Sequence, residues 1–203
     1  MSFPVVVLVS GEGTNLQAIL DQVHGREADV VGVASSRADA RGLERARGAG
    51  IETAVFAIGD YEDRAARDVA LADWIEALGA RLVVLAGFME LLGPEFIGRF
   101  RNAIVNVHPA LLPAFPGVHA VEQTLEYGVK VAGVTVHFVD EGVDSGPIIL
   151  QRSYELPYPR DIVAIESQVH QIEHELLPEA VRLIANGKVR IDVDDPRWVV
   201  IDD

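Results

Sequence analysis

The sequence of 203 residues contains no cysteine. This absence excludes disulfide bonds, a thiolate nucleophile and a cysteine-ligated metal for the chain. The apolar run near the N-terminus, Val5–Val9, is far shorter than a membrane span or a signal sequence. No basic cluster precedes that run. We therefore expect a cytoplasmic protein that does not act at a membrane.

Basic residues are scarce, because 17 Lys and Arg face 31 Asp and Glu and leave a formal net charge of −14. A strongly acidic surface repels polyphosphate, so we expect no nucleic acid partner. A small anionic substrate remains compatible if backbone dipoles or a few placed cations form its site. Hydrophobic content of 49% and charged content of 24% are typical of a globular chain. The length suits one domain over residues 1–203.

Strand-like and helix-like segments alternate along the first half of the chain. Continuous β-branched runs bounded by turn residues predict strands buried on both faces, as in a parallel sheet. Apolar residues at helical spacing, ended by glycine, predict the helices between them. The predicted strands are 5–9, 30–34, 53–57, 82–86 and 104–107, and the predicted helices are 15–22, 40–49 and 61–78. This alternation indicates a doubly wound α/β fold with a mostly parallel sheet.

The pattern changes in the second half. Residues 131–139 and 148–154 resemble two longer strands that pair partly antiparallel across a Gly-rich loop. Apolar residues at helical spacing predict a long C-terminal amphipathic helix over 162–186, with Pro178 as a candidate kink. The tail, residues 189–201, is expected to add an edge hairpin.

The segment most indicative of chemistry is Asn106-Val107-His108-Pro109. Side chains two apart on a strand share a face, so an amide and an imidazole project together from a strand end that proline terminates. Asp144, in a distant Gly-rich loop, would complete a set suited to moving a proton and holding an oxyanion. The alternative for the pair is an ordinary loop-anchoring hydrogen bond.

Other polar residues near these motifs have plainer interpretations. We interpret His119 as a surface or supporting residue and His137 as a strand residue. Asp140 and Glu141 suit a solvated acidic turn. Because the carboxylate spacing matches no EF-hand and no HExxH pair is present, we expect no metal.

The Gly-rich turn Ser10–Leu16 joins the first strand to the first helix. Leu16 stands where the dinucleotide fingerprint has its third glycine, and no Gly-Lys-Ser/Thr follows, so neither nucleotide motif is present. A plain turn capped by Thr14 or Asn15 is one interpretation. We favour the binding of a single phosphate, because ligands of doubly wound folds bind beyond the carboxyl ends of the strands.

A second loop, Gly87–Leu92, follows the fourth strand. An apolar loop at that edge suits a pocket for a flat heterocycle, although Phe88 and Leu92 also suit core packing. Arg64 is interpreted as a solvated residue at a helix start. His170 and Glu173 share a face of the long helix and are interpreted as surface residues.

Five segments together resemble the folate-dependent formyltransferase family, and the start at Ser10 resembles its purine-synthesis branch. The resemblance covers the chain from Val5 to about Gly187 and is carried by Ser10–Ile19, Leu85–Met89, Asn106–Pro113, Pro116–His119 and Val136–Ile149. It implies transfer of a formyl group from 10-formyltetrahydrofolate, as co-substrate and without a metal, to the amine of glycinamide ribonucleotide.

The same resemblance assigns roles to individual residues. It implies that Asn106, His108 and Asp144 are catalytic. The implied substrate-binding residues are Gly13, Thr14, Asn15, Gly87, Pro109, His170 and Glu173. The implied folate-binding residues are Arg64, Leu85, Phe88, Met89, Glu90, Leu91, Leu92, Val139, Asp140 and Glu141. The family often carries a basic residue where this chain has Glu90, so main-chain contacts with the folate are expected there. A cis peptide between Leu112 and Pro113 is also implied.

Rival interpretations remain open at this stage. A tRNA formyltransferase would need an additional basic domain, which length and charge oppose. A formyltetrahydrofolate hydrolase of the same fold would release formate without the ribonucleotide. A non-catalytic folate- or nucleotide-binding module would bind ligand without turnover. Either a monomer or a homodimer is compatible with the sequence.

Overall fold

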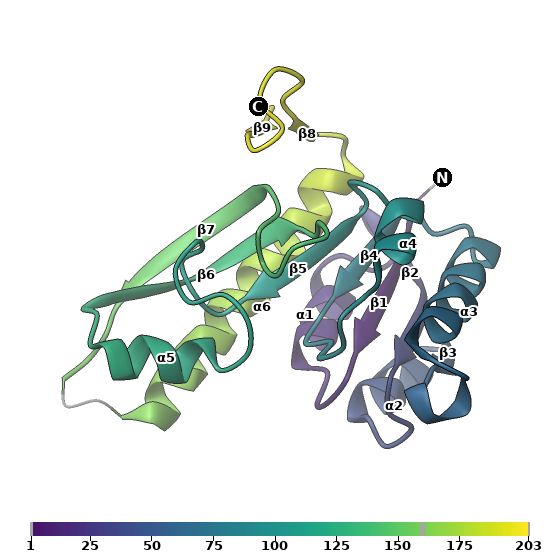
Figure 1. Ribbon diagram of the computed structural model, residues 1–203, viewed down its shortest axis with the longest axis horizontal. Coiled ribbons are helices and arrows are strands. Elements are labelled where there is room, and N and C mark those ends of the chain that lie inside the picture. The colour runs from purple at the N-terminus through teal and green to yellow at the C-terminus, as the bar shows by residue number, and fades with distance from the viewer. Residues whose placement is uncertain (1, 159–160, 203) are drawn as a thin grey trace. The chain divides into compact units, whose positions relative to one another are not determined.

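The computed structural model describes residues 2–158 and 161–202 (Figure 1). The chain divides into two compact units, residues 1–105 and 106–203. The strand β5 (Ile104–His108) crosses the boundary, so its first two residues belong to the first unit and its last three to the second.

The first unit contains a parallel sheet in the strand order β3-β2-β1-β4, followed by the start of β5. The strands are β1 (Phe3–Val9), β2 (Ala28–Ser35), β3 (Glu52–Val55) and β4 (Leu82–Leu85). The side chains of residues 5–9 are fully buried, as expected of a central strand covered on both faces. This burial explains why a run of β-branched residues forms β1.

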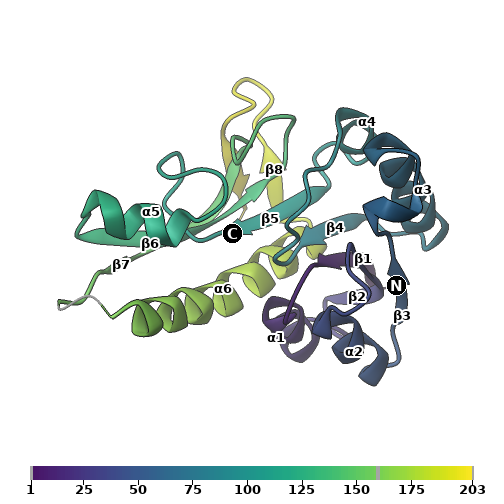
Figure 2. The same cartoon turned by 60° about the horizontal axis from the view of Figure 1, so that its bottom comes forward.

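Helices cover both faces of that sheet. They are α1 (Thr14–Gln22), α2 (Arg41–Gly48), α3 (Arg64–Ala77) and α4 (Pro94–Arg99), with a short 3₁₀ turn, η1 (Ile58–Asp60). Within this unit, α1 and α2 lie on one face and α3 with α4 on the other (Figure 2). Gly32 of β2 allows close packing of α3, because a Cβ there would lie 2.5 Å from the Leu78 side chain.

The second unit contains the end of β5 followed in strand order by β6 (Val131–Phe138) and β7 (Ile148–Glu155). β6 and β7 pair antiparallel, with Val134 opposite Arg152. The long helix α6 (Ile162–Ala185) buries one stripe of apolar side chains and includes the buried Pro178. A shorter helix, α5 (Ala120–Tyr127), and a separate hairpin of β8 (Val189–Ile191) and β9 (Val199–Ile201) complete the unit.

The predicted fold class is confirmed: the fold is α/β, its sheet is mostly parallel, and the long C-terminal helix is present. Two helices, α4 and α5, were not predicted. Both are short, at six and eight residues, and short segments show little periodicity. The expectation of one domain over residues 1–203 stays a prediction. Within the described parts of the chain, no helix is both long and apolar enough to cross a membrane.

Candidate active site

The end of β5 presents an amide and an imidazole on one face, as the spacing of Asn106 and His108 predicts. Val105 and Val107 alternate with them and are buried on the other face. The His108 side chain is only 5% exposed. A buried polar ring needs partners for both of its nitrogens. The strand therefore places a buried histidine whose two ring nitrogens need partners within the site.

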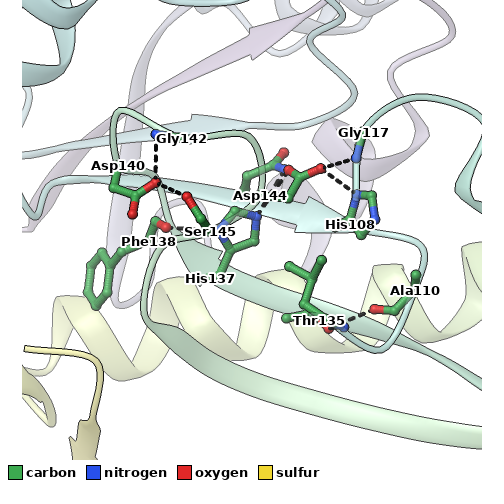
Figure 3. Close-up of polar contacts among 12 residues, drawn as sticks. His108, Ala110, Gly117, Thr135, His137, Phe138, Asp140, Gly142, Asp144 and Ser145 are labelled. Atoms are coloured by element: carbon green, nitrogen blue, oxygen red, sulfur yellow. Dashed lines mark hydrogen bonds and ion pairs between the residues drawn. The ribbon is translucent and has the colours of Figure 1, made fainter. Parts of the chain in front are cut away.

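Both ring nitrogens of His108 have acceptors. Nδ1 lies 3.3 Å from Oδ2 of Asp144 (Figure 3). Nε2 lies 2.8 Å from the carbonyl oxygen of Phe115. Phe115 supplies that carbonyl from a left-handed conformation, with φ of 54°. A carbonyl and a carboxylate can only accept, so both contacts become hydrogen bonds only when the ring carries two protons. Each ring nitrogen is therefore placed to donate a proton to an oxygen of the site.

Asp144 is the hub of the site. Its Oδ2 accepts a hydrogen bond of 2.7 Å from the backbone N–H of Gly117, in addition to facing His108. Its Oδ1 lies 3.4 Å from Nδ2 of Asn106 and 3.5 Å from Nε2 of His137. Burial acts to raise the pKa of Asp144, but the His137 and Gly117 hydrogen bonds and the charge of His108 outweigh it and lower the pKa to about 2. The carboxylate is therefore ionised throughout the neutral range.

The loop between β6 and β7 holds Asp144 in place. Asp144 itself has φ of 50°, a left-handed conformation that aspartate tolerates better than most residues. Asp140 Oδ1 accepts hydrogen bonds from the Gly142 N–H at 3.1 Å and the Ser145 hydroxyl at 2.7 Å. A Cβ on Gly146 would lie 1.9 Å from the Phe138 carbonyl oxygen. Asp140 thus stabilises this loop through its side chain. The interpretation of Asp140 as part of a simple solvated turn is therefore incomplete.

His137 is a site residue that sequence reasoning missed. Its Nδ1 lies 2.8 Å from the Phe138 carbonyl oxygen, and its Nε2 faces both Asp144 Oδ1 and Asn106 Nδ2, the latter at 3.3 Å. The side chain is 2% exposed. Two buried histidines therefore flank one carboxylate. Only its position one residue before the strand end hinted at this, and its partners are distant in sequence.

In the first unit, the turn after β1 forms an uncapped helix N-terminus. Gly13 has φ of 70°, and no side chain caps α1. A Cβ on Gly13 would lie 2.5 Å from Cα of Gly42, so only glycine fits there. The first N–H groups of a helix lack intrahelical partners and attract anions. Neither Thr14 nor Asn15 caps the helix, which disagrees with the plain-turn interpretation.

The turn after β1 is tied to the loop after β4 within the same unit. The Ser10 N–H donates to the Gly87 carbonyl at 3.2 Å, and the Met89 N–H donates to the Ser10 hydroxyl at 3.0 Å. Ser10 Oγ also lies 3.2 Å from Ser36 Oγ. The sequence-predicted phosphate turn and heterocycle loop therefore lie side by side at the carboxyl ends of β1 and β4.

A buried ion pair fastens the heterocycle loop to α3. Arg67 is fully buried, and its Nε donates to Asp68 Oδ1 at 2.7 Å. Asp68 Oδ2 accepts from the Gly93 N–H at 2.7 Å, and Arg67 Nη2 donates to the Leu91 carbonyl at 3.3 Å. Arg67 Nη1 lies 4.0 Å from Glu90 Oε2. This pair was not predicted, because adjacent charges on a helix suggest a solvated face.

The remaining predicted residues of the first unit line or flank that loop. Leu85 is buried at the end of β4, whereas Met89 and Leu91 are 73% and 60% exposed. Phe88 and Leu92 are half-buried, so neither is a core residue in this unit. Arg64 is exposed at the first position of α3, as expected.

In the second unit, the two predicted residues of α6 behave differently. His170 is exposed, and its ring stacks on that of His174 with centroids 6.3 Å apart. Burial and the neighbouring His170 lower the pKa of His174. Glu173 is 7% exposed, so its interpretation as a surface residue is wrong. The helix turns Glu173 toward its buried stripe, because Ile172 and Leu176 lie on that side.

The other predicted residues of the second unit lie next in sequence to β5 and in the segment after β6. Pro109 and Val139 are half-buried and Glu141 is exposed. The peptide between Leu112 and Pro113 is cis, which confirms the implied geometry. Within residues 2–158 and 161–202, no three His, Asp or Glu side chains form a group that could hold a metal ion.

An α/β fold whose strand end carries a buried histidine, an amide and an ionised carboxylate is typical of enzymes that move a proton during group transfer. The family described as formyl transferase matches residues 4–181. The chain belongs to the formyltransferase family.

Individual relatives agree with this membership. The chain is 39% identical to phosphoribosylglycinamide formyltransferase of Escherichia coli, over 96% of this chain and 92% of that protein. It is 41% identical to the trifunctional purine biosynthetic protein adenosine-3 of Drosophila melanogaster, covering 92% of this chain and only 14% of that longer protein. The crystal structure of glycinamide ribonucleotide transformylase 1 from Symbiobacterium toebii has a TM-score of 0.94 at 47% identity, over 100% of this chain and 95% of that one.

Proposed function

We propose that this chain transfers the formyl group of 10-formyltetrahydrofolate to the amine of glycinamide ribonucleotide, a step of purine synthesis. The observation that carries the proposal is the set of contacts that joins Asn106, His108 and Asp144. Support comes from two relatives named phosphoribosylglycinamide formyltransferase, which are identical to this chain at about two fifths of the aligned positions. In this proposal the chain is a cytoplasmic enzyme, monomeric or homodimeric, that uses no metal and binds no nucleic acid.

The reaction needs a neutral amine, a stabilised oxyanion and a protonated leaving nitrogen. His108, when both of its ring nitrogens carry protons, supplies both positive charge and a proton. Its 2.8 Å contact to Phe115 is shorter than its 3.3 Å contact to Asp144. These two contacts hold the ring in place. As the amine attacks the formyl carbon and the bond from that carbon to the leaving nitrogen breaks, His108 gives one proton through water to the leaving nitrogen and regains one, again through water, from the attacking nitrogen.

Asn106 supplies the second oxyanion donor. Its Nδ2 contacts, 3.4 Å to Asp144 and 3.3 Å to His137, are long for hydrogen bonds. Little is lost when the amide turns its N–H toward a developing negative charge. Asp144 does not contact the reacting atoms in this scheme: it orients the His108 ring and stabilises its charge.

The substrate sites are assigned residue by residue. Gly13, Thr14 and Asn15 offer backbone N–H groups to the single phosphate, and the ribonucleotide also uses Gly87, Pro109, His170 and Glu173. The folate uses two segments and one side chain. These are 85–92, including Phe88, Met89, Glu90, Leu91 and Leu92; 139–141, including Val139, Asp140 and Glu141; and Arg64.

The decisive experiment measures deformylation of 10-formyltetrahydrofolate by absorbance, with and without glycinamide ribonucleotide. We expect a signal only when the ribonucleotide is present. Formate release without it would identify a hydrolase instead. Ligand binding without any turnover would identify a non-catalytic module.

A variant series assigns the roles. Asn106→Ala removes an oxyanion donor and should lower kcat by roughly 10²–10³-fold. Asp144→Asn keeps the shape of the side chain but removes its charge. This variant should lower kcat and should also shift the pH profile of kcat. Glu126→Gln, which alters an exposed acid of α5 in the same unit, is the control and should leave kcat unchanged. An Asp144→Asn enzyme with full kcat and the wild-type profile would refute the role of Asp144.

A further inference from the structure

The second unit contains a cavity of about 580 Å³ beside the C-terminal hairpin. Its walls come from that hairpin, from the segment around the cis Pro113 and from the loop that carries Asp144. The volume is within the range of roughly 300–1,000 Å³ typical of small-molecule sites. Asp144 is the one residue assigned above that lines it.

Flat apolar surfaces dominate the cavity walls. Pro113, Pro116 and Pro147 line it together with the indole of Trp198. Trp198 is 66% exposed, although tryptophan is usually well buried. The hairpin backbone holds it, because the Trp198 N–H donates to the Asp195 carbonyl at 2.9 Å and its carbonyl accepts from Asp192 at 2.8 Å. An exposed indole on a hydrogen-bonded backbone offers a stacking surface.

Arg197 adds a positive charge to the same cavity. The nearby carboxylates of Asp192 and Asp195 accept hydrogen bonds from backbone N–H groups of their own turn. Among the described residues, no carboxylate lies within ion-pair distance of that guanidinium. On the same hairpin, Arg190 lies 3.7 Å from Asp202.

We propose that this cavity binds a flat aromatic molecule that carries an anionic group. The ring would stack on Trp198 between the proline faces, and the anion would pair with Arg197. Both oxygens of the Asp144 carboxylate already face other groups, namely the Gly117 N–H and the rings of His108 and His137. A purine mononucleotide and an aryl-glutamate both have this chemistry. Of the residues proposed for the reaction, the cavity shares Asp144 alone.

Tryptophan fluorescence tests the proposal on the intact chain. Inosine monophosphate and p-aminobenzoylglutamate are the two probes, each titrated separately with excitation at the red edge of tryptophan absorption. We expect at least one probe to quench the emission saturably at millimolar concentration or below. The probe that binds identifies the source of the anion, as phosphate or carboxylate.

Two variants locate the binding. Arg197→Gln should raise the Kd about tenfold or more, because a charge-assisted hydrogen bond is lost. Arg190→Gln, which alters a paired arginine of the same hairpin, should leave the Kd unchanged. In Trp198→Phe, the quenching should disappear while Trp74 still reports folding. Absence of binding by both probes, or binding that Arg197→Gln leaves unaltered, overturns the proposal.

Discussion

At the scale of single residues, Asp144 makes the stability of the protein depend on acid. Its pKa lies at about 2 in the folded chain, against an ordinary value of 3.8. A carboxyl with a depressed pKa stabilises the fold above its unfolded pKa, and this contribution is lost as the pH falls through the folded pKa. We expect about 2 kcal/mol to be lost between about pH 4 and pH 2. Urea unfolding of wild type and Asp144→Asn over that window measures it, and parallel losses in both proteins would contradict the assignment.

His137 is the second residue whose effect can be isolated. Its hydrogen bond is the largest of the interactions that lower the pKa of Asp144. His137→Gln should therefore raise that pKa, and the carboxyl carbon-13 shift of Asp144 over a pH titration would measure the change. His119→Gln is the control, because exposed His119 contacts Glu122 instead. An unmoved Asp144 titration in His137→Gln would rule out the interaction.

At the scale of elements, the turn before α1 requires glycine for two separable reasons. Gly13 and Gly25 both have φ of 70°, but only Gly13 faces a neighbour, with Gly42 Cα 2.5 Å from the site of a Cβ. Gly25→Ala should cost about 1 kcal/mol, from backbone conformation alone. Gly13→Ala should lower the free energy of unfolding in urea by distinctly more. It should also raise the KM for the ribonucleotide by a larger factor than the KM for the folate. Equal costs for the two variants would show that the close approach is unimportant.

The ion pair beneath the heterocycle loop has a different signature. Arg67→Met leaves Asp68 buried and charged, which should cost about 3–5 kcal/mol. Adding Asp68→Asn removes that charge and should recover much of the loss, while the Asn oxygen still accepts from Gly93. Arg99→Gln is the control: Arg99 pairs with the exposed Asp73 and Glu76, and should cost about 1 kcal/mol or less. An Arg67→Met variant as stable as the wild type would contradict this account.

How much of each element the sequence could predict follows from where its stabilisation arises. Residues 5–9 form the expected strand because local composition already specifies burial on both faces. Asn106 and His108 share a face because strand geometry fixes it. By contrast, the buried faces of α3 and α6 include charged Arg67 and Glu173. Tertiary packing buries both side chains, as the distant Leu91 carbonyl that accepts from Arg67 illustrates. Local periodicity therefore assigns them to the surface.

At the scale of the whole molecule, excess negative charge should weaken the fold at low ionic strength. The chain has 31 acidic and 17 basic residues, and like charges repel more in the compact state. Raising the salt from 0.01 M to 0.15 M shortens the screening length from about 30 Å to about 8 Å. We expect the Tm at pH 8 to rise with NaCl over this range. A Tm that falls would show that salt-sensitive ion pairs outweigh the net repulsion.

One hydroxyl in the first unit has a thermodynamic consequence. Ser10 Oγ accepts from the N–H of Met89 and lies beside Ser36, while its own backbone opens the turn before α1. A ligand that shifts one of these two loops therefore changes the energy of the other. Linkage requires such an effect to be reciprocal: if ribonucleotide tightens folate binding by some factor, folate tightens ribonucleotide binding by the same factor. In the proposed reaction Ser10 would thus provide a route for heterotropic cooperativity through the protein, in addition to the direct contact of the two ligands that formyl transfer requires.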